Sequence, residues 1–212
     1  MSLRTKRSLA ALAVTAVATG SAFAAAPAQA APSGDRSLAT VLAADGNHLD
    51  RNWDDFDILD KAVHAVLAAD PSSPVAVLAD GSTKLTAFLP TDRAFRRLVT
   101  SLTGKRPATE RATLRAVTSV ADAPTLEKIL LYHVVPGQTI TYRQARHADG
   151  ARLTTALGPK IRVNVIDQRV VKLRDLDPDA ANPRVLASLK NINHDNVQIA
   201  HGINRVLRPM DL

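Results

Sequence analysis

The stretch from Leu85 to Phe95 most constrains how this chain can fold, because it joins a strand, a sharp turn and a helix start. Residues 85–88 are apolar and β-prone and follow a turn signal. Pro90 lacks an amide hydrogen and keeps the preceding residue extended, so strand pairing is expected to end there. Thr91 or Asp92 can then accept hydrogen bonds from the first amides of the next helix.

The helix predicted after this bend has apolar residues at helical spacing up to Leu102, and Gly104 ends it. Phe88 and Phe95 are two of only four phenylalanines, and they lie on either side of the bend. We therefore expect the bend to direct both rings into one core. The stretch contains no catalytic constellation, so its predicted role is architectural.

Residues 1–30 are typical of a secretory signal peptide. Arg4, Lys6 and Arg7 form a basic start, an apolar run follows at 9–19, and residues 28–30 form a small-x-small cleavage site. A retained membrane anchor is the alternative, but the run is rich in alanine, interrupted by polar residues and short for a span. Because no other run is long enough to cross a bilayer, we expect a secreted, extracellular protein without a membrane span in the mature chain.

The composition excludes several classes of function. The chain has no cysteine, which rules out disulfides, a lipid-modified cysteine, thiol catalysis and thiolate metal sites. The formal charge is +7, and removal of residues 1–30 leaves 24 basic against 20 acidic residues. This modest excess suits weak attraction to anionic polymers and predicts no nucleic-acid partner.

The remaining pattern predicts one α+β domain at 55–212, preceded by a partly mobile leader at 31–54. Helical spacing is found first, and alternation of period two follows it. We expect a twisted β-sandwich or wedge packed against several α-helices. The expected helices are a short one at 37–42 within the leader and longer ones at 56–67, 94–103, 109–120 and 124–133. The expected strands are 85–88, 138–142, 152–157, 160–166, 169–174 and 197–207.

Possible metal and catalytic motifs are incomplete. Asp175, Asp177 and Asp179 resemble the start of a calcium loop, but the glycine and glutamate expected later in such a loop are missing, which favours a solvated acidic turn. His194 and His201 lack tight metal-ligand spacing. Nucleophile-elbow and phosphate-loop motifs are also missing, so no catalytic residue, cofactor or metal is predicted.

Three stretches in this order resemble the fasciclin (FAS1) domain, and the resemblance covers roughly residues 55–212. The first is Leu85–Phe95, the second is Leu131–Gly137 with its Tyr-His pair, and the third is Ile199–Pro209. The positions that carry the fold signature are Phe88, Pro90, Thr91, Asp92, Phe95, His201 and Asn204.

The third stretch departs from the family pattern. Val197 and Gln198 stand where the family usually has Asn-Gly, and Asn204 stands where aspartate is usual. The loss of Asn-Gly predicts a differently shaped connection before the last strand. Asn204 can accept hydrogen bonds but carries no charge, so whether a charge-dependent family function persists is left open.

The resemblance implies a role in extracellular adhesion, and in animal members the Tyr-His segment has been tied to integrin recognition. This makes Tyr132 and His133 candidate interaction residues. From the helical spacing alone, His133 lies on an apolar face, which favours a buried hydrogen bond that holds the turn. Tyr132 is expected to present its ring to a groove or to solvent.

The sequence therefore predicts a secreted, non-enzymatic FAS1 domain of bacterial type that engages an extracellular or cell-wall polymer or protein. Arg93, Arg96 and Arg97 are predicted on the outward side of the first-motif helix, where they could meet anionic polymers or simply form a solvated face. One alternative is a carrier that holds a small apolar ligand in a cleft between helices and sheet. Another is a hydrolase of wall or matrix material, which would need clustered titratable residues.

Overall fold

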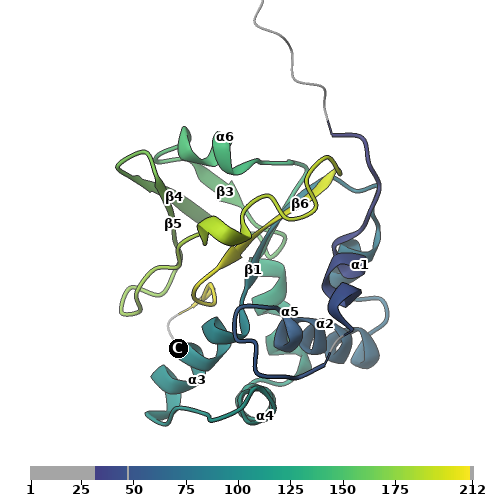
Figure 1. Cartoon of the computed structure of the whole chain (residues 1–212), viewed down its shortest axis with the longest axis vertical. Helices are drawn as coiled ribbons and strands as arrows, with labels where there is room; N and C mark the ends of the chain where they lie inside the picture. The colour runs from purple at the N-terminus through teal and green to yellow at the C-terminus, as the bar shows by residue number, and fades with distance from the viewer. Residues whose placement is uncertain (1–31, 47, 211–212) are drawn as a thin grey trace, which may run out of the picture. The chain divides into compact units, whose positions relative to one another are not determined.

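Two three-stranded sheets and a group of helices make up the part of the chain that the computed structural model describes, residues 32–46 and 48–210 (Figure 1). The predicted signal peptide at 1–30 lies outside the described residues. The order of helices first and mainly strands afterwards agrees with the predicted α+β class.

The first sheet has the order β2-β1-β6, with β1 antiparallel to β2 and parallel to β6. The second sheet has the order β3-β4-β5 and is antiparallel throughout. The strands are β1 (Leu85–Pro90), β2 (Val134–Pro136), β3 (Arg152–Thr154), β4 (Lys160–Ile166), β5 (Val170–Arg174) and β6 (Gln198–Ile203).

Most helices precede the second sheet in the chain. The α-helices are α1 (Leu38–Leu42), α2 (Asp57–Ala69), α3 (Asp92–Thr103), α4 (Glu110–Val120), α5 (Ala123–Tyr132) and α6 (Tyr142–Arg146), and the 3-10 helices are η1 (Ala43–Asp45), η2 (Pro74–Ala79) and η3 (Ala187–Leu189). None of the helices in the described ranges is long and apolar enough to cross a membrane.

Strand β1 separates two hydrophobic cores, and all of its residues are buried. Leu85, Ala87 and Leu89 pack in the core formed with the helices, together with Phe95 of α3. Phe88 points to the opposite face and packs in the core that contains the inner face of β3-β4-β5. The expectation that Phe88 and Phe95 share one core is therefore wrong, because successive side chains of a strand point to opposite faces.

The short helix expected within the partly mobile leader forms as α1 and is packed into the domain. Leu38 is 0% exposed and Leu42 is 4% exposed, and both belong to the helical core. The N-cap of α1 is Ser37, whose hydroxyl accepts from the amide of Thr40. Because α1 buries both leucines against the rest of the domain, the folded unit begins well before residue 55.

The region after α5 also differs from prediction. The strand β2 forms at Val134–Pro136, whereas the expected strand at 138–142 is replaced by a loop and α6. Thr86 of β1 holds this loop in place: its hydroxyl donates to the carbonyl of Gln138 and accepts from the amide of Ile140. A side chain thus meets the backbone hydrogen-bonding needs that a sheet ladder would otherwise meet.

Candidate functional site

At the bend after β1, the starts of α2 and α3 each form capping hydrogen bonds with the other helix's N-terminal segment. The α3 amides of Asp92 and Arg93 donate to the carbonyls of Asp55 and Trp53. The Asp92 carboxylate in turn accepts from the amide of Ile58, at 3.0 Å, in the first turn of α2, which has no side-chain cap of its own. The prediction that Thr91 or Asp92 caps the helix that follows is wrong: the Thr91 side chain makes no cap bond, and Asp92 serves α2.

His133 joins the end of α5 to the C-terminal segment. Its Nδ1 donates to the carbonyl of Ile129 at 2.7 Å, and its Nε2 accepts from the amide of Leu207 at 2.9 Å. Burial lowers the pKa of His133 to about 4, so the ring is neutral at pH 7. The prediction of a buried, structural hydrogen bond is confirmed.

Tyr132 is fully enclosed, with an exposed fraction of 0%. Burial is the main cause that raises the pKa of its hydroxyl to about 12. The expectation that its ring faces a groove or solvent is therefore wrong. Since His133 is also buried, neither side chain is accessible to a macromolecular partner in this conformation.

His201 connects β6 to neighbouring loops. Its Nε2 donates to the carbonyl of Ile140 at 2.8 Å, its Nδ1 accepts from the amide of Asn191, and burial lowers its pKa. It is the register partner of Phe88 in β1, and the two ring centroids lie 6.1 Å apart. Because both ring nitrogens of His201 and of His133 bind main-chain groups, neither ring has a free nitrogen for acid–base chemistry or for a metal.

In the third motif, the side chains of Gln198 and Asn204 form hydrogen bonds to main-chain groups. The Gln198 amide accepts from the amide of Leu38 and donates to the carbonyls of Val77 and Asp80. The Asn204 side chain accepts from the amide of Arg184, as a neutral acceptor can. The loop before β6 has positive φ at Asn191, Asn193 and Asp195. The residues that tolerate a turn conformation therefore precede Val197 and Gln198, the positions where the family pattern has Asn-Gly.

The acidic turn after β5 is not fully solvated, contrary to prediction. Asp177 is 3% exposed and pairs with Arg208 at 2.8 Å between Nη1 and Oδ2. Asp175 accepts from the amide of Arg208. The two carboxylates therefore hold the C-terminal segment in place.

The three arginines predicted on α3 do lie on its outer side, but each contacts protein groups. Arg93 forms a two-bond pair with Asp54, Arg96 donates to the carbonyl of Pro107 and stacks on a tryptophan, and Arg97 donates to the carbonyl of Asn204. The Arg96 guanidinium lies 4.0 Å from the ring centroid of Trp53. Their donors are thus partly used within the domain.

A second basic surface lies on the outer side of the β3-β4-β5 sheet. Arg152, Arg162 and Arg174 are register partners across the three strands, so their exposed side chains form one row. Lysines and a further arginine extend this row. We call the group formed by Arg152, Lys160, Arg162, Lys172, Arg174 and Arg184 the basic sheet face.

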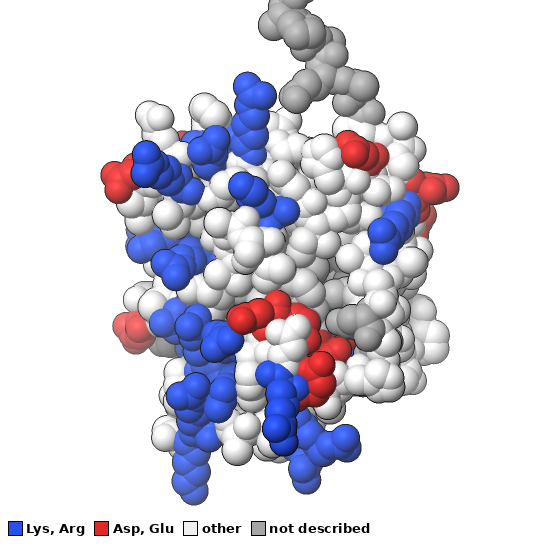
Figure 2. Space-filling model, in the orientation of Figure 1, with Lys and Arg blue, Asp and Glu red and all other residues white. Residues whose placement is uncertain are grey.

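A hollow of about 480 Å³ lies along the row and is lined by Arg152, Lys160, Arg162 and Arg174, with Asp175 and Leu176 at one end. Basic side chains are prominent in Figure 2 on the side of the domain that carries β4, β5 and α3. The alternation along residues 160–166 predicts that Lys160 and Arg162 point to the same side of their strand. Nothing in the sequence predicts that Arg152 and Arg174 lie beside Arg162 on the neighbouring strands.

A largely apolar cavity of about 450 Å³ lies where α6, the loop before it and both sheets meet. Phe88, Ile140 and Leu173 supply much of its lining, and Gln144 and His201 supply polar groups. Tyr132 does not line this cavity, although it packs in the same hydrophobic core as Phe88.

The fasciclin domain model matches residues 59–209, which is more than half of the chain. The chain belongs to the fasciclin domain family. Among solved structures, a FAS1 domain pair from the insect cell adhesion molecule fasciclin I is similar, with 15% sequence identity and a TM-score of 0.45. That match covers 71% of this chain and 45% of the insect chain, so the protein spans less than half the length of that chain. No curated protein matches the sequence.

Fasciclin domains are generally non-enzymatic, adhesion-type domains, and they are typically extracellular or secreted. In this fasciclin domain, the residues of the three sequence motifs hold strands, helices and the C-terminal segment together. Among the described residues, the basic sheet face and the apolar cavity are two features that a partner can reach without displacing these motif contacts.

Proposed function

We propose that this protein is a secreted, non-enzymatic fasciclin domain that attaches to an anionic extracellular or cell-wall polymer through the basic sheet face. The observation that carries the proposal is the row of Arg152, Arg162 and Arg174 on directly opposed positions of three strands. Membership of the fasciclin family supports the adhesion role.

In the absence of a partner, this row of arginines is expected to destabilise the folded sheet. Like charges directly opposite each other on a sheet destabilise it, and here one arginine, Arg162, faces an arginine on each side. No ion pair with these three arginines is found among the described residues. A polymer that carries regularly spaced phosphate, sulfate or carboxylate groups would compensate this repulsion along the whole row.

The experiment measures binding of the purified protein to isolated cell walls and to a soluble polyphosphate at rising salt. We expect the triple variant Arg152→Gln, Arg162→Gln, Arg174→Gln to bind about 10-fold more weakly, since three surface contacts of about 0.5 kcal/mol each are lost. Binding by the unmodified protein should weaken as salt rises.

Two further triple variants separate the basic sheet face from general charge. Lys105→Gln, Arg111→Gln, Arg115→Gln removes the same charge at exposed positions elsewhere and should bind normally. Arg93→Gln, Arg96→Gln, Arg97→Gln tests the α3 surface. Binding that is insensitive to salt, or that is lost equally in all three variants, would contradict the proposal.

The apolar cavity supports a second candidate, the carrier of a small apolar ligand. Its volume of about 450 Å³ and its apolar lining are in the range of small-molecule pockets. Ala148 and Ala151 line it and are half-buried, so Ala148→Leu should fill part of the space. A fatty acid that binds the unmodified protein and the Ala148→Leu variant equally, or binds neither, would exclude this candidate.

A further inference from the structure

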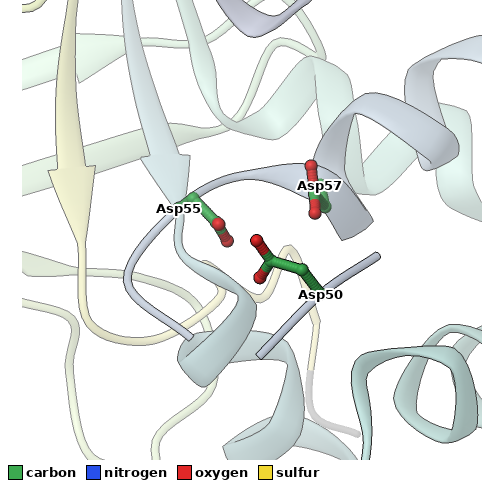
Figure 3. Close-up of side chains that lie close together, drawn as sticks. All are labelled: Asp50, Asp55 and Asp57. Carbon is green, nitrogen blue, oxygen red and sulfur yellow. The ribbon is translucent and has the colours of Figure 1, made fainter. Parts of the chain in front are cut away.

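Three helices begin at one place in the fold, and each begins with an acidic residue. These residues are Asp57 of α2, Asp92 of α3 and Glu110 of α4. The loop before α2 adds Asp50 and Asp55. Figure 3 shows the carboxyl groups of Asp50, Asp55 and Asp57 gathered beside the start of α2, and Figure 2 shows acidic side chains gathered over this region. Helix starts attract negative charge, which accounts for one acidic residue at each of the three helices, whereas Asp50 and Asp55 add two further carboxylates.

The inner part of this cluster contains buried carboxylate oxygens with few hydrogen-bond partners. Glu110 and Asp92 are both 0% exposed. Both carboxylate oxygens of Glu110, the second oxygen of Asp92 and one oxygen of Asp55 accept no hydrogen bond of normal geometry. The contacts that stabilise them include one from the main chain of Asp50 to Glu110 and one between the side chains of Asp55 and Asp92. Buried carboxyl groups with so few hydrogen-bond partners are rare and costly, because these contacts replace only part of the hydration that burial removes.

The carboxylate oxygens of the cluster also lie close enough together to bind one metal ion. One ligand atom from each of Asp55, Asp92 and Glu110 lies within 4.8 Å of the others, and the same holds for Asp50, Asp55 and Asp57. Two ligands of one calcium ion, each 2.3–2.6 Å from the metal, can be at most about 5 Å apart. Asp55 belongs to both groups and is half-buried, so it connects the buried oxygens to the surface.

The carboxyl groups of the cluster are close to one another and mostly shielded from solvent, so each disfavours the ionisation of its neighbours. Burial, reinforced by the neighbouring carboxylates, raises the pKa of Asp55 to about 6, of Glu110 to about 7 and of Asp92 to about 9. The main chain of Asp50 opposes the shift at Glu110. Among the described residues no Lys or Arg forms an ion pair with these three carboxyl groups.

We propose that Asp55, Asp92 and Glu110 bind a divalent cation of the calcium class, with Asp50 and Asp57 as outer oxygen donors. Calcium fits better than magnesium, because it accepts many carboxylate oxygens in irregular geometry, whereas magnesium requires a regular octahedron and keeps several waters. The ion would tie the starts of α2, α3 and α4 together. This site is separate from the basic sheet face and does not depend on the proposed function.

The test uses the purified protein expressed from the full chain, after treatment with a chelator. Isothermal titration with CaCl₂ at pH 7 is expected to show one site with a Kd in the range of about 10⁻⁴–10⁻³ M, typical of extracellular modules. Calcium at 10 mM should raise the Tm by roughly 3–6 °C. Absence of both heat and Tm shift up to 10 mM would overturn the proposal, and equal affinity for MgCl₂ would overturn the assignment to calcium.

The chain offers a matched pair of variants, because Glu110 and Glu127 are its only glutamates. Glu110→Gln should weaken calcium binding at least 10-fold and remove the calcium-dependent rise in Tm, whereas Glu127→Gln, on α5, should behave as the unmodified protein. Circular dichroism establishes that Glu110→Gln is folded, and Asp55→Asn provides a second, less buried position with the same expected loss. Unchanged calcium binding in both cluster variants would show that these residues are not ligands.

Discussion

The imidazole Nε2 of His133 accepts a hydrogen bond of 2.9 Å from the amide of Leu207, and this bond joins the second sequence motif to the third. The other ring nitrogen donates to the carbonyl of Ile129 within α5. Because both nitrogens of the ring are used inside the domain, the histidine of the Tyr-His pair stabilises the fold, and its polar atoms are not available to a partner in this conformation.

Replacing His133 by phenylalanine should destabilise the domain by about 2–4 kcal/mol, because two buried main-chain groups lose their partner while an aromatic ring still fills the site. Urea unfolding followed by circular dichroism measures this. His147→Phe is the matched control, since His147 makes the same bond to a carbonyl one turn earlier but is exposed. A cost below 1 kcal/mol for His133→Phe would contradict the tethering role.

The contribution of His133 should also depend on pH. Its pKa is lowered to about 4 in the folded state, whereas an unfolded histidine titrates near 6.5. The unfolded state therefore binds the proton first, and stability present above pH 6.5 is lost as pH falls toward 4. The stability difference between the unmodified protein and His133→Phe should shrink by roughly 3 kcal/mol between pH 7 and pH 4. A constant difference across this range would disprove the shift, because all other titrating groups are common to both proteins.

Leu38→Ala tests whether the segment before residue 55 belongs to the folded domain. Leu38 is 0% exposed, so its truncation should cost about 2–5 kcal/mol. Leu176, which is 48% exposed, provides the control Leu176→Ala with little expected effect. Equal midpoints of urea unfolding for the two variants would indicate that α1 does not contribute to stability.

Gln198→Glu should be strongly destabilising although it changes only one group. The Gln198 amide donates to the carbonyls of Val77 and Asp80, and a carboxylate has no hydrogen to donate to either. We expect a loss of at least about 2 kcal/mol at pH 7, measured by urea unfolding. Gln138→Glu makes the same change at an exposed position and should be close to neutral; a similar loss there would refute the argument.

Arg162→Gln should weaken polymer binding yet stabilise the fold. Removal of the middle arginine relieves repulsion from Arg152 and Arg174, by about 0.3–0.5 kcal/mol at low salt. The gain should vanish at about 1 M salt, where the Debye length is about 3 Å. Arg115→Gln on α4 is the control. Destabilisation by Arg162→Gln at low salt would mean that the row contributes favourably to folding.

Several features could be predicted from the sequence because they depend on neighbours in the chain. The end of β1 at Pro90, the helix that follows and its stop at Gly104 all appear where local chemistry predicts them. The helical spacing also placed His133 on a buried face correctly. The strand predicted at 138–142 failed because a distant side chain, Thr86, binds that backbone.

The candidate sites depended on contacts that no local pattern reveals. Alternation along β4 determined that Lys160 and Arg162 share a side, but only strand register set Arg152 and Arg174 beside Arg162. Asp55, Asp92 and Glu110 are far apart in the sequence. Each of them is an ordinary type of residue at or just before a helix start, so no local pattern predicts that their carboxyl groups meet.

The sequence by itself determined the family, the α+β class and the bend at Leu85–Phe95, since these follow from short motifs and the spacing of apolar residues. Only the tertiary structure decided which charged groups meet and which motif residues are buried. The physical reason is that burial, charge clustering and the exchanged caps of α2 and α3 arise from packing between distant segments, whereas turns and periodicity arise between neighbours.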